Sequence, residues 1–318
     1  IASGRPVTAD TAFAVASITK TFTAAVVLDL VEDGLIELDG LVRRYLPDLD
    51  LPMDERTTVR QLLDHTSGLR DYFLDPRIDR ALLGATDASW TAERALDYVG
   101  APSFAAGRGW RYSNTNYLVL GLLAEAVSGE SMADLYRTRF LVPLDLRHTV
   151  YQPAGATDGP VATGYRFASG ALTEPAIDLS DGSGITPFTS VVTAAAAAGG
   201  MASSADDVAR WARALYAGTA LEPATRAAML GGVALTDALD ADIPYGLGVQ
   251  SIELDGRVSY GHSGRLLGSR SVVRHFPAER ITIAVLTNQS RADPSTIARS
   301  LVRIALRPIE RCGCTLHD

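Results

Sequence analysis

The chain contains a single lysine, Lys20, among its 29 basic residues. It stands three positions after Ser17, and residues three apart share one face of a helix. Arginine stays protonated at ordinary pH, whereas a desolvated lysine can lose its proton and act as a base. A lysine amine beside a serine hydroxyl therefore predicts an activated serine nucleophile. The 22 serines in 318 residues make this spacing easy to reach by chance, so the prediction needs further residues.

Two other short motifs supply such residues. Tyr112-Ser113-Asn114 lies in GWRYSNTNY, and His262-Ser263-Gly264 lies in VSYGHSGRLLGS. Each motif alone has an ordinary structural explanation: a packing tyrosine, a turn asparagine, or a hydrogen-bonded histidine in a strand. The three motifs in this order are much more specific than any one of them.

Ser-x-x-Lys, Tyr-x-Asn and His-x-Gly together resemble the serine β-lactamase and penicillin-binding-protein superfamily. The resemblance is to the branch that contains class C β-lactamases, D-alanyl-D-alanine carboxypeptidases, D-aminopeptidases and related esterases. It extends from about residue 6 to about residue 306, and further similar segments lie between the motifs, at 63–69, 112–123, 202–218 and 245–249. The similarity to the D-alanyl-D-alanine carboxypeptidases is the greatest.

The resemblance implies a role for each of these residues. Ser17 would attack a carbonyl and form an acyl-enzyme, and Lys20 or Tyr112 would be the general base. A cationic Lys20 would lower the pKa of Tyr112, so residues alone leave the choice of base open. Asn114 would hold Lys20 and donate an amide hydrogen bond to the substrate carbonyl.

The third motif would line the substrate cleft. His262 and Ser263 lie on a predicted strand, and Gly264 would allow the substrate to approach the backbone closely. In the resembling family, the oxyanion hole uses the backbone N–H of the nucleophile and of the residue after the His-x-Gly glycine. These groups are the N–H of Ser17 and the N–H of Arg265, so we expect both at the reacting carbonyl.

The resemblance leaves the substrate open among a D-peptide, an ester and a β-lactam. His262 replaces the lysine of class C β-lactamases, which argues against efficient β-lactam turnover. The carboxypeptidases have an arginine shortly after the segment matching Tyr245–Gly248, where this chain has Val249-Gln250-Ser251. A D-aminopeptidase or an esterase therefore stays in competition with a carboxypeptidase. A non-catalytic penicillin-binding or scaffold protein is a further alternative.

Composition excludes several other classes. A net charge of −8 and a pI near 5.2 argue against nucleic acid as a partner, and no apolar run reaches the length of a transmembrane helix. No Gly-x-Ser-x-Gly occurs, which argues against the nucleophile elbow of an α/β-hydrolase. No cluster of His, Asp and Glu has metal-site spacing, and we expect no cofactor and no metal. Cys312 and Cys314, separated by one residue, predict neither an unstrained disulfide nor a metal site. Ser67, in His65-Thr66-Ser67, has no lysine nearby and is predicted to belong to a turn.

Periodicity predicts the elements that position the motifs. Apolar residues at helical spacing predict a helix over residues 17–33, ended by Gly34, with Ser17 in or next to its first turn. Residues 145–200, including the five alanines Ala194–Ala198, predict loops and short elements only. Ser204 with Asp206 and Asp207 predicts the start of a helix that ends at Gly218. Further helices are predicted near 57–64, 91–99, 115–128, 132–140 and 294–306.

The last third of the chain reads as strands. Alternating apolar residues predict strands at 245–253, 257–261, 269–276 and 281–288, joined by short turns. The expected fold class is an antiparallel sheet flanked by helices with a helical lobe, as in β-lactamases and transpeptidases. We expect one catalytic unit: a mostly helical part at 17–200, an α/β part at 201–306 and a tail at 307–318.

Relatives carry a helix and two sheet strands ahead of the segment that matches residues 4–20. This chain starts almost at that segment, so either the preceding segment is not part of the given sequence or the sheet is built with fewer strands. We therefore expect association with a second copy or with an upstream fragment, because an open strand edge seeks a partner. The resemblance also implies an extracytoplasmic or secreted protein whose signal peptide is outside the given sequence.

Overall fold

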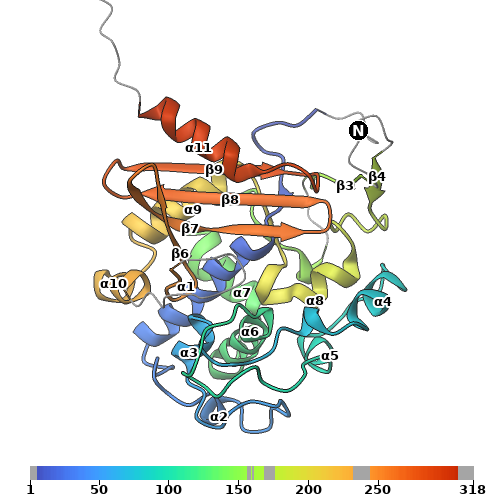
Figure 1. The fold of residues 1–318 in the computed structure, drawn as a ribbon, viewed down its shortest axis with the longest axis vertical. Coiled ribbons are helices and arrows are strands. Elements are labelled where there is room, and N and C mark those ends of the chain that lie inside the picture. The colour runs from blue at the N-terminus through green and yellow to red at the C-terminus, as the bar shows by residue number, and fades with distance from the viewer. Residues whose placement is uncertain (1–5, 156–158, 160, 168–175, 232–243, 307–318) are drawn as a thin grey trace, which may run out of the picture.

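The computed structural model describes residues 6–155, 159, 161–167, 176–231 and 244–306. An antiparallel four-stranded sheet of order β6-β7-β8-β9 lies along one side of the molecule (Figure 1). Its strands are β6 (Gln250–Leu254), β7 (Arg257–Leu266), β8 (Ser269–Phe276) and β9 (Ile281–Thr287). The four predicted strands are found, but the first begins at Gln250 rather than at residue 245, because the chain turns at Gly248, which has φ of +79°. β7 is longer than predicted because its pairing with β8 continues to Leu266, which lies opposite Ser269.

Both faces of this sheet are covered. Side chains of a strand alternate between faces, so Val272 and Val273 point in opposite directions. Val272 packs in a small apolar cluster with Ala298 and Val302 of α11 (Pro294–Ala305). Val273 belongs to the main core on the other face, where α9 (Ala205–Ala217) also packs. The sheet is therefore held between α11 and the rest of the molecule.

The helical part lies below the sheet in Figure 1, around α1 (Thr19–Glu32). α1 is buried on nearly all sides, among α6 (Asn114–Ser128), α7 (Met132–Tyr136) and α8 (Thr189–Gly199). Gly34, with φ of +74°, follows it, as predicted for a helix stop. The shorter helices are α2 (Val42–Tyr45), α3 (Val59–Leu63), α4 (Ile78–Leu83), α5 (Ala92–Leu96) and α10 (Pro223–Gly231).

The expectation of loops and short elements over residues 145–200 is wrong at its end. α8 occupies residues 189–199 and includes all five alanines. Every residue of α8 is buried, so it shows no polar face and no amphipathic periodicity. A helix that is apolar on all sides cannot be distinguished by periodicity from an apolar loop sequence.

Small sheets connect the two parts. β1 (Phe13–Ala14), β5 (Met201–Ser203) and β2 (Val150–Tyr151) pair antiparallel in the order β1-β5-β2, and β3 (Gly164–Arg166) pairs with β4 (Ile177–Leu179). The N–H of Val15 donates to the carbonyl of Met201 at 3.0 Å. The segment that leads into the predicted nucleophile is therefore fixed on β5.

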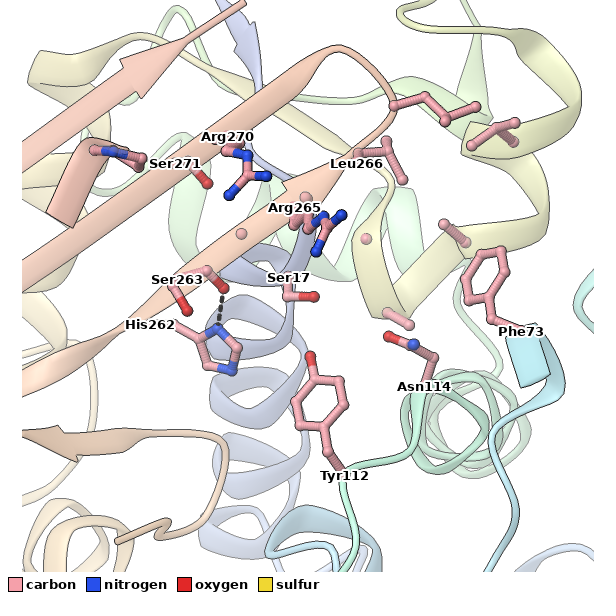
Figure 2. A pocket seen from close by; sticks show the side chains of 18 of the residues that line it. Ser17, Phe73, Tyr112, Asn114, His262, Ser263, Arg265, Leu266, Arg270 and Ser271 are labelled. Atoms are coloured by element: carbon pink, nitrogen blue, oxygen red, sulfur yellow. Dashed lines mark hydrogen bonds between the residues drawn. The ribbon is translucent and has the colours of Figure 1, made fainter. Parts of the chain in front are cut away.

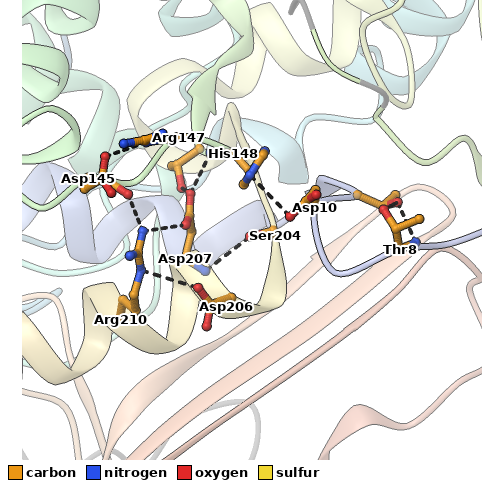
Figure 3. A network of polar contacts seen from close by, with 11 residues as sticks. Thr8, Asp10, Asp145, Arg147, His148, Ser204, Asp206, Asp207 and Arg210 are labelled. Atoms are coloured by element: carbon orange, nitrogen blue, oxygen red, sulfur yellow. Dashed lines mark hydrogen bonds and ion pairs between the residues drawn. The ribbon is translucent and has the colours of Figure 1, made fainter.

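The start of α9 is tied to its surroundings by polar contacts (Figure 3). Ser204 caps the helix, because its hydroxyl accepts from the N–H of Asp207 at 3.2 Å. The buried carboxylate of Asp207 accepts from the N–H of His148 at 2.7 Å and from the hydroxyl of Thr149 at 3.0 Å. The predicted helix start at Ser204 is confirmed, and Gly218 follows the last helical residue.

The antiparallel sheet flanked by helices agrees with the predicted mixed α/β fold class. Among the described residues, no helix is both long and apolar enough to cross a membrane. The division into parts at 17–200 and 201–306 stays a prediction. The predicted tail at 307–318, with Cys312 and Cys314, lies outside the described residues.

Candidate active site

Ser17 lies in a 3₁₀ turn, Ala16–Ile18, that runs directly into α1. Its neighbour Ala16 has φ of +50°, a conformation that costs energy for any residue with a Cβ. Ser17 is partly exposed, while the residues around it are buried. Figure 2 shows its hydroxyl in the open space between β7 and the start of α6, close to the hydroxyl of Tyr112. The turn thus presents one hydroxyl from an otherwise closed core.

The side chain of Lys20 is fully buried and makes three hydrogen bonds. Its Nζ lies 3.1 Å from Ser17 Oγ, 2.7 Å from Asn114 Oδ1 and 2.7 Å from the carbonyl oxygen of Ala198. The carbonyl of Ala198 and the Oδ1 of Asn114 are acceptors only. When Lys20 is a neutral amine, its two N–H groups point to these acceptors, and its lone pair points to the Ser17 hydroxyl.

Burial favours this neutral form. Desolvation lowers the pKa of Lys20 to about 7, and the negative charge of Asp71 opposes the shift. Near neutral pH, a substantial fraction of Lys20 is therefore an amine facing Ser17. The structure thus brings Lys20 and Ser17 together as their spacing predicts.

Tyr112 lies next to Ser17, but the expected lowering of its pKa is wrong. Burial raises the pKa of Tyr112, and its hydrogen bond to Ser17 lowers it by less. Lys20 lies 4.9 Å from the centre of the Tyr112 ring, over the face of the ring. The phenol is therefore protonated at neutral pH and suited to donate a proton.

His262 and Ser263 lie on β7 beside Ser17, as predicted (Figure 2). His262 Nδ1 lies 2.6 Å from the carbonyl oxygen of Ser263, and its Nε2 lies 2.9 Å from the hydroxyl of Tyr245. A carbonyl only accepts, so Nδ1 carries the proton and Nε2 accepts from Tyr245. Burial and the charge of Lys20 lower the pKa of His262 to about 3. The imidazole is therefore neutral at pH 7.

Position 264 must be a glycine because neighbouring segments of the protein leave no room for a side chain there. A Cβ at Gly264 would lie 2.2 Å from the carbonyl oxygen of Val15 and 2.3 Å from Ser271 Oγ. The group that lies close to the Gly264 backbone is thus the segment before Ser17, whereas the sequence predicted that the substrate would lie there. Ser271 Oγ donates to the Val15 carbonyl at 2.7 Å, which attaches this segment to β8.

The backbone of Arg265 points toward the cleft. The N–H of Ser263 donates to Gln250 Oε1 at 3.1 Å, away from β8. Backbone N–H groups two residues apart on a strand point the same way, so the N–H of Arg265 points to the same edge. β6 pairs with β7 only up to Gly261, which leaves this N–H beyond the end of β6. The oxyanion role of the Ser17 and Arg265 N–H groups stays a prediction.

Reasoning from the sequence missed several residues of the site, among them Ala198 and His65. Ala198, one of the five alanines, accepts a hydrogen bond from Lys20 through its backbone carbonyl. Every residue has this carbonyl, so the residue type gives no indication of the contact. His65 is fully buried, and its ring centre lies 4.4 Å from that of Tyr112. The N–H of Ser113 donates to His65 Nδ1 at 3.3 Å. Ser67 takes no part, because its hydroxyl donates to Asn116 Oδ1 in the core, consistent with its predicted structural role.

A cavity of about 800 Å³ opens beside Ser17. One wall is apolar, and the rim carries charges of both signs. The wall includes Phe73, Leu82, Leu83, Val191 and Leu266, and the charged residues are Asp79, Arg166, Arg265, Arg270 and Asp293. The site can therefore hold a substrate with an apolar group and with polar or charged ends.

Comparison with known proteins agrees with this geometry. The family model described as Beta-lactamase matches residues 1–306. A D-aminopeptidase from Gluconobacter oxydans (strain 621H) is 28% identical over 307 residues, covering 96% of this chain and 54% of the relative. Penicillin-binding protein 4 from Amycolatopsis lactamdurans is 30% identical over 300 residues, covering 90% of this chain and 74% of the relative.

Among solved structures, a D-stereospecific amidohydrolase from Streptomyces sp. superposes with a TM-score of 0.79 at 30% identity. The match covers 90% of this chain and 84% of that structure. Against the D-aminopeptidase, by contrast, this chain spans only about half of the relative's length.

Proposed function

Since this chain belongs to the beta-lactamase family, we propose that it is a serine hydrolase that cleaves amides and short peptides of D-amino acids. One observation carries the proposal: Lys20 has two partners that only accept, so that its lone pair faces the Ser17 hydroxyl. The D-aminopeptidase and the D-stereospecific amidohydrolase among the similar proteins support the substrate class.

The reaction would proceed through an acyl-enzyme. Lys20 takes the proton of Ser17, and Ser17 Oγ attacks the carbonyl carbon of the amide. The negative charge on the carbonyl oxygen would be held by the N–H groups of Ser17 and Arg265. As the C–N bond breaks, a proton passes to the leaving nitrogen, with the protonated Tyr112 as the donor beside Ser17. The protonated Lys20 then gives its proton to Tyr112, so that both groups are neutral again. Water attacks the ester as Lys20 takes one of its protons, and this proton passes to Ser17 Oγ when the ester bond breaks.

A substrate panel tests the proposal. The p-nitroanilides of D-alanine and D-phenylalanine would be compared with their L-isomers, p-nitrophenyl acetate and a chromogenic cephalosporin. We expect kcat/KM for the D-anilides to exceed that for the L-anilides by at least about tenfold. Equal rates for the D- and L-anilides, or the fastest turnover with p-nitrophenyl acetate, would indicate an esterase instead of a D-amino-acid amidase. Labelling by fluorophosphonate without turnover of any of these compounds would indicate a non-catalytic binding protein.

A specific observation also favours a second candidate, a D-alanyl-D-alanine carboxypeptidase. Gln250 stands near the place of the family's carboxylate-binding arginine, and Arg274 of β8 donates to Gln250 Oε1 at 2.7 Å. The Arg274 side chain is buried, and its Nη1 has no hydrogen-bond partner among the described residues. The guanidinium of Arg274, on β8, therefore brings a positive charge next to Gln250, near the position of the family's arginine.

The two candidates differ in what they require of the substrate's end. A carboxypeptidase would cleave diacetyl-Lys-D-Ala-D-Ala and reject its C-terminal amide, because the carboxylate would lose its cationic partner. An aminopeptidase-like enzyme would cleave D-alanine p-nitroanilide and reject its N-acetyl derivative. The Arg274→Gln variant would raise KM in the first case only.

A further inference from the structure

A buried carboxylate that the proposed chemistry does not use lies behind Asn114. Asp71 is 9% exposed and directly precedes the 3₁₀ turn Tyr72–Leu74. Its Oδ2 accepts from Asn114 Nδ2 at 2.7 Å, and its Oδ1 accepts from the N–H of Phe73 at 3.0 Å. Both oxygens receive N–H groups, which is the pattern expected of an ionised carboxylate.

Asp71 decides which way the Asn114 amide faces. An ionised carboxylate only accepts, so the NH₂ end of the amide must point to Asp71. The oxygen end then faces Lys20 Nζ, at 2.7 Å. With the amide reversed, Asn114 would present N–H groups to Lys20 and an oxygen to a carboxylate, and both contacts would be lost.

The amide orientation in turn fixes the direction of the Lys20 lone pair. Two of the three Lys20 contacts must be pure acceptors for the lone pair to face Ser17, and the Ala198 carbonyl supplies only one of them. The other is the oxygen of Asn114. We propose that Asp71 is a positioning residue of the acylation step, which holds the Asn114 amide so that the lone pair of Lys20 faces Ser17.

Asp71 also supplies a charge. The rings of Tyr112 and Tyr117 lie under Lys20 Nζ, and His65, in the turn after α3, and His262, on β7, face it. Burial and the charge of Lys20 lower the pKa of both histidines, so neither adds a charge near pH 7. Asp71 raises the pKa of Lys20 against the effect of burial. Loss of its charge would therefore move the ionisation of Lys20 to lower pH.

The simpler explanation is that Asp71 only caps the turn. The contact of Oδ1 with Phe73 is such a cap, but the contact of Oδ2 with Asn114 is not needed for it. Asp71→Asn separates the two roles from each other, because an amide offers one acceptor oxygen for two donors. Either the cap or the contact with Asn114 must be lost.

The double variant Asp71→Asn/Asn114→Asp tests the same idea from the other side. The new amide at position 71 can cap Phe73 with its oxygen and donate to the new carboxylate at position 114. That carboxylate accepts from Lys20 with its other oxygen, so every hydrogen bond is retained while the charge moves next to Lys20. The matched control is Asp75→Asn, a partly buried aspartate of the same loop that is paired with the exposed Arg77.

The test measures acylation, so it rests on the proposed serine chemistry but not on the proposed D-amide substrate. Acylation rates with p-nitrophenyl acetate and a fluorophosphonate would be recorded from pH 5 to 10, at about half-unit steps, with thermal unfolding of each variant. For Asp71→Asn, we expect the highest acylation rate in the pH profile to fall about tenfold or more. The rise of the rate on the acid side of the profile (the acid limb), which reports the pKa of Lys20, should move to lower pH. The double variant should recover most of the rate and move the acid limb above that of wild type. Asp75→Asn should match wild type in both.

Two results would overturn the proposal: a wild-type rate and acid limb in Asp71→Asn, or a double variant no faster than the single one. If Asp71→Asn does not fold, the double variant still tests the shift of the limb. Failure of wild type to be labelled at Ser17 would instead contradict the proposed function itself.

Discussion

At the scale of single residues, the site is a set of side chains whose protonation states are set by burial. Lys20 is an amine with a pKa near 7, Tyr112 stays protonated, and His262 is neutral. The types and spacing of these residues predict their proximity, and the structure brings them together. Which residue is the base does not follow from the sequence, because it depends on how deeply each group is buried.

Lys20→Arg should abolish acylation without unfolding the protein. The variant keeps the charge, but a guanidinium does not lose its proton and has no lone pair to offer Ser17. We expect labelling by a fluorescent penicillin to fall at least about 10²-fold, with the circular dichroism spectrum unchanged. A variant as active as wild type would exclude Lys20 as the base. Peptide mapping of the wild-type adduct should give Ser17.

Tyr112→Phe should reduce kcat more for anilides than for activated esters. A poor leaving group needs a proton from the phenol, whereas p-nitrophenolate leaves without one. We expect a loss of about 10²-fold with a D-anilide and a much smaller loss with p-nitrophenyl acetate. Equal losses with both substrates would indicate that Tyr112 acts on Ser17 and not on the leaving group.

Penicillins should acylate Ser17, and the resulting acyl-enzyme should be hydrolysed slowly. Acylation needs only Ser17, a base and the oxyanion donors, whereas deacylation also needs a water at the acyl carbonyl, which the bulky adduct blocks. The neutral His262 also holds the β-lactam carboxylate less firmly than an ammonium group does. Stopped-flow kinetics with time-resolved mass spectrometry should show a stable adduct and turnover slower than about one per second. Faster turnover would identify a β-lactamase.

At the scale of elements, the sequence predicts those with a clear apolar periodicity or a cap. α9 follows from Ser204 and its two aspartates, and β8 and β9 follow from alternating apolar residues. α8 could not be predicted, because all its faces are buried and its residues are small. Its contribution to the site is a backbone carbonyl, that of Ala198, and such a group is set by chain geometry rather than by residue type.

Ser204→Ala tests the cap of α9. The variant loses the hydrogen bond from the N–H of Asp207 to the Ser204 hydroxyl, and should lower the free energy of unfolding by about 1 kcal/mol. The rate of Ser17 acylation should not change, because α9 supplies no residue to the site. Ser300→Ala, an exposed serine on α11, is the control and should change neither quantity. Urea unfolding would show whether α9 depends on this cap.

At the scale of the whole molecule, one edge of the main sheet is open among the described residues. β9 ends the strand order and carries no charged residue that would discourage pairing. Beside it, α11 exposes the apolar side chains of Ile297, Leu301 and Ile304, at 45%, 41% and 61%. This edge and the exposed face of α11 together form a surface suited to a further strand or helix.

We therefore expect this surface to associate with a second copy of the chain or with another segment that adds a strand or a helix to it. Size-exclusion chromatography with light scattering and intact-mass analysis would show which. Leu301→Lys/Ile304→Lys should weaken the association, because charges on the exposed apolar face are costly to bury. The control is Leu83→Lys, an exposed leucine on α4. A stable monomer of wild type would contradict this expectation.

The burial of the only lysine has a practical consequence for following the protein in solution. Amine-directed reagents modify accessible lysine side chains, and this chain has one, enclosed between α1, α6 and α8. Modification of Lys20 by an N-hydroxysuccinimide ester therefore requires this junction to open. Mass spectrometry can follow this modification at a single residue. Its rate would report how often the helices around Lys20 open, without an introduced probe.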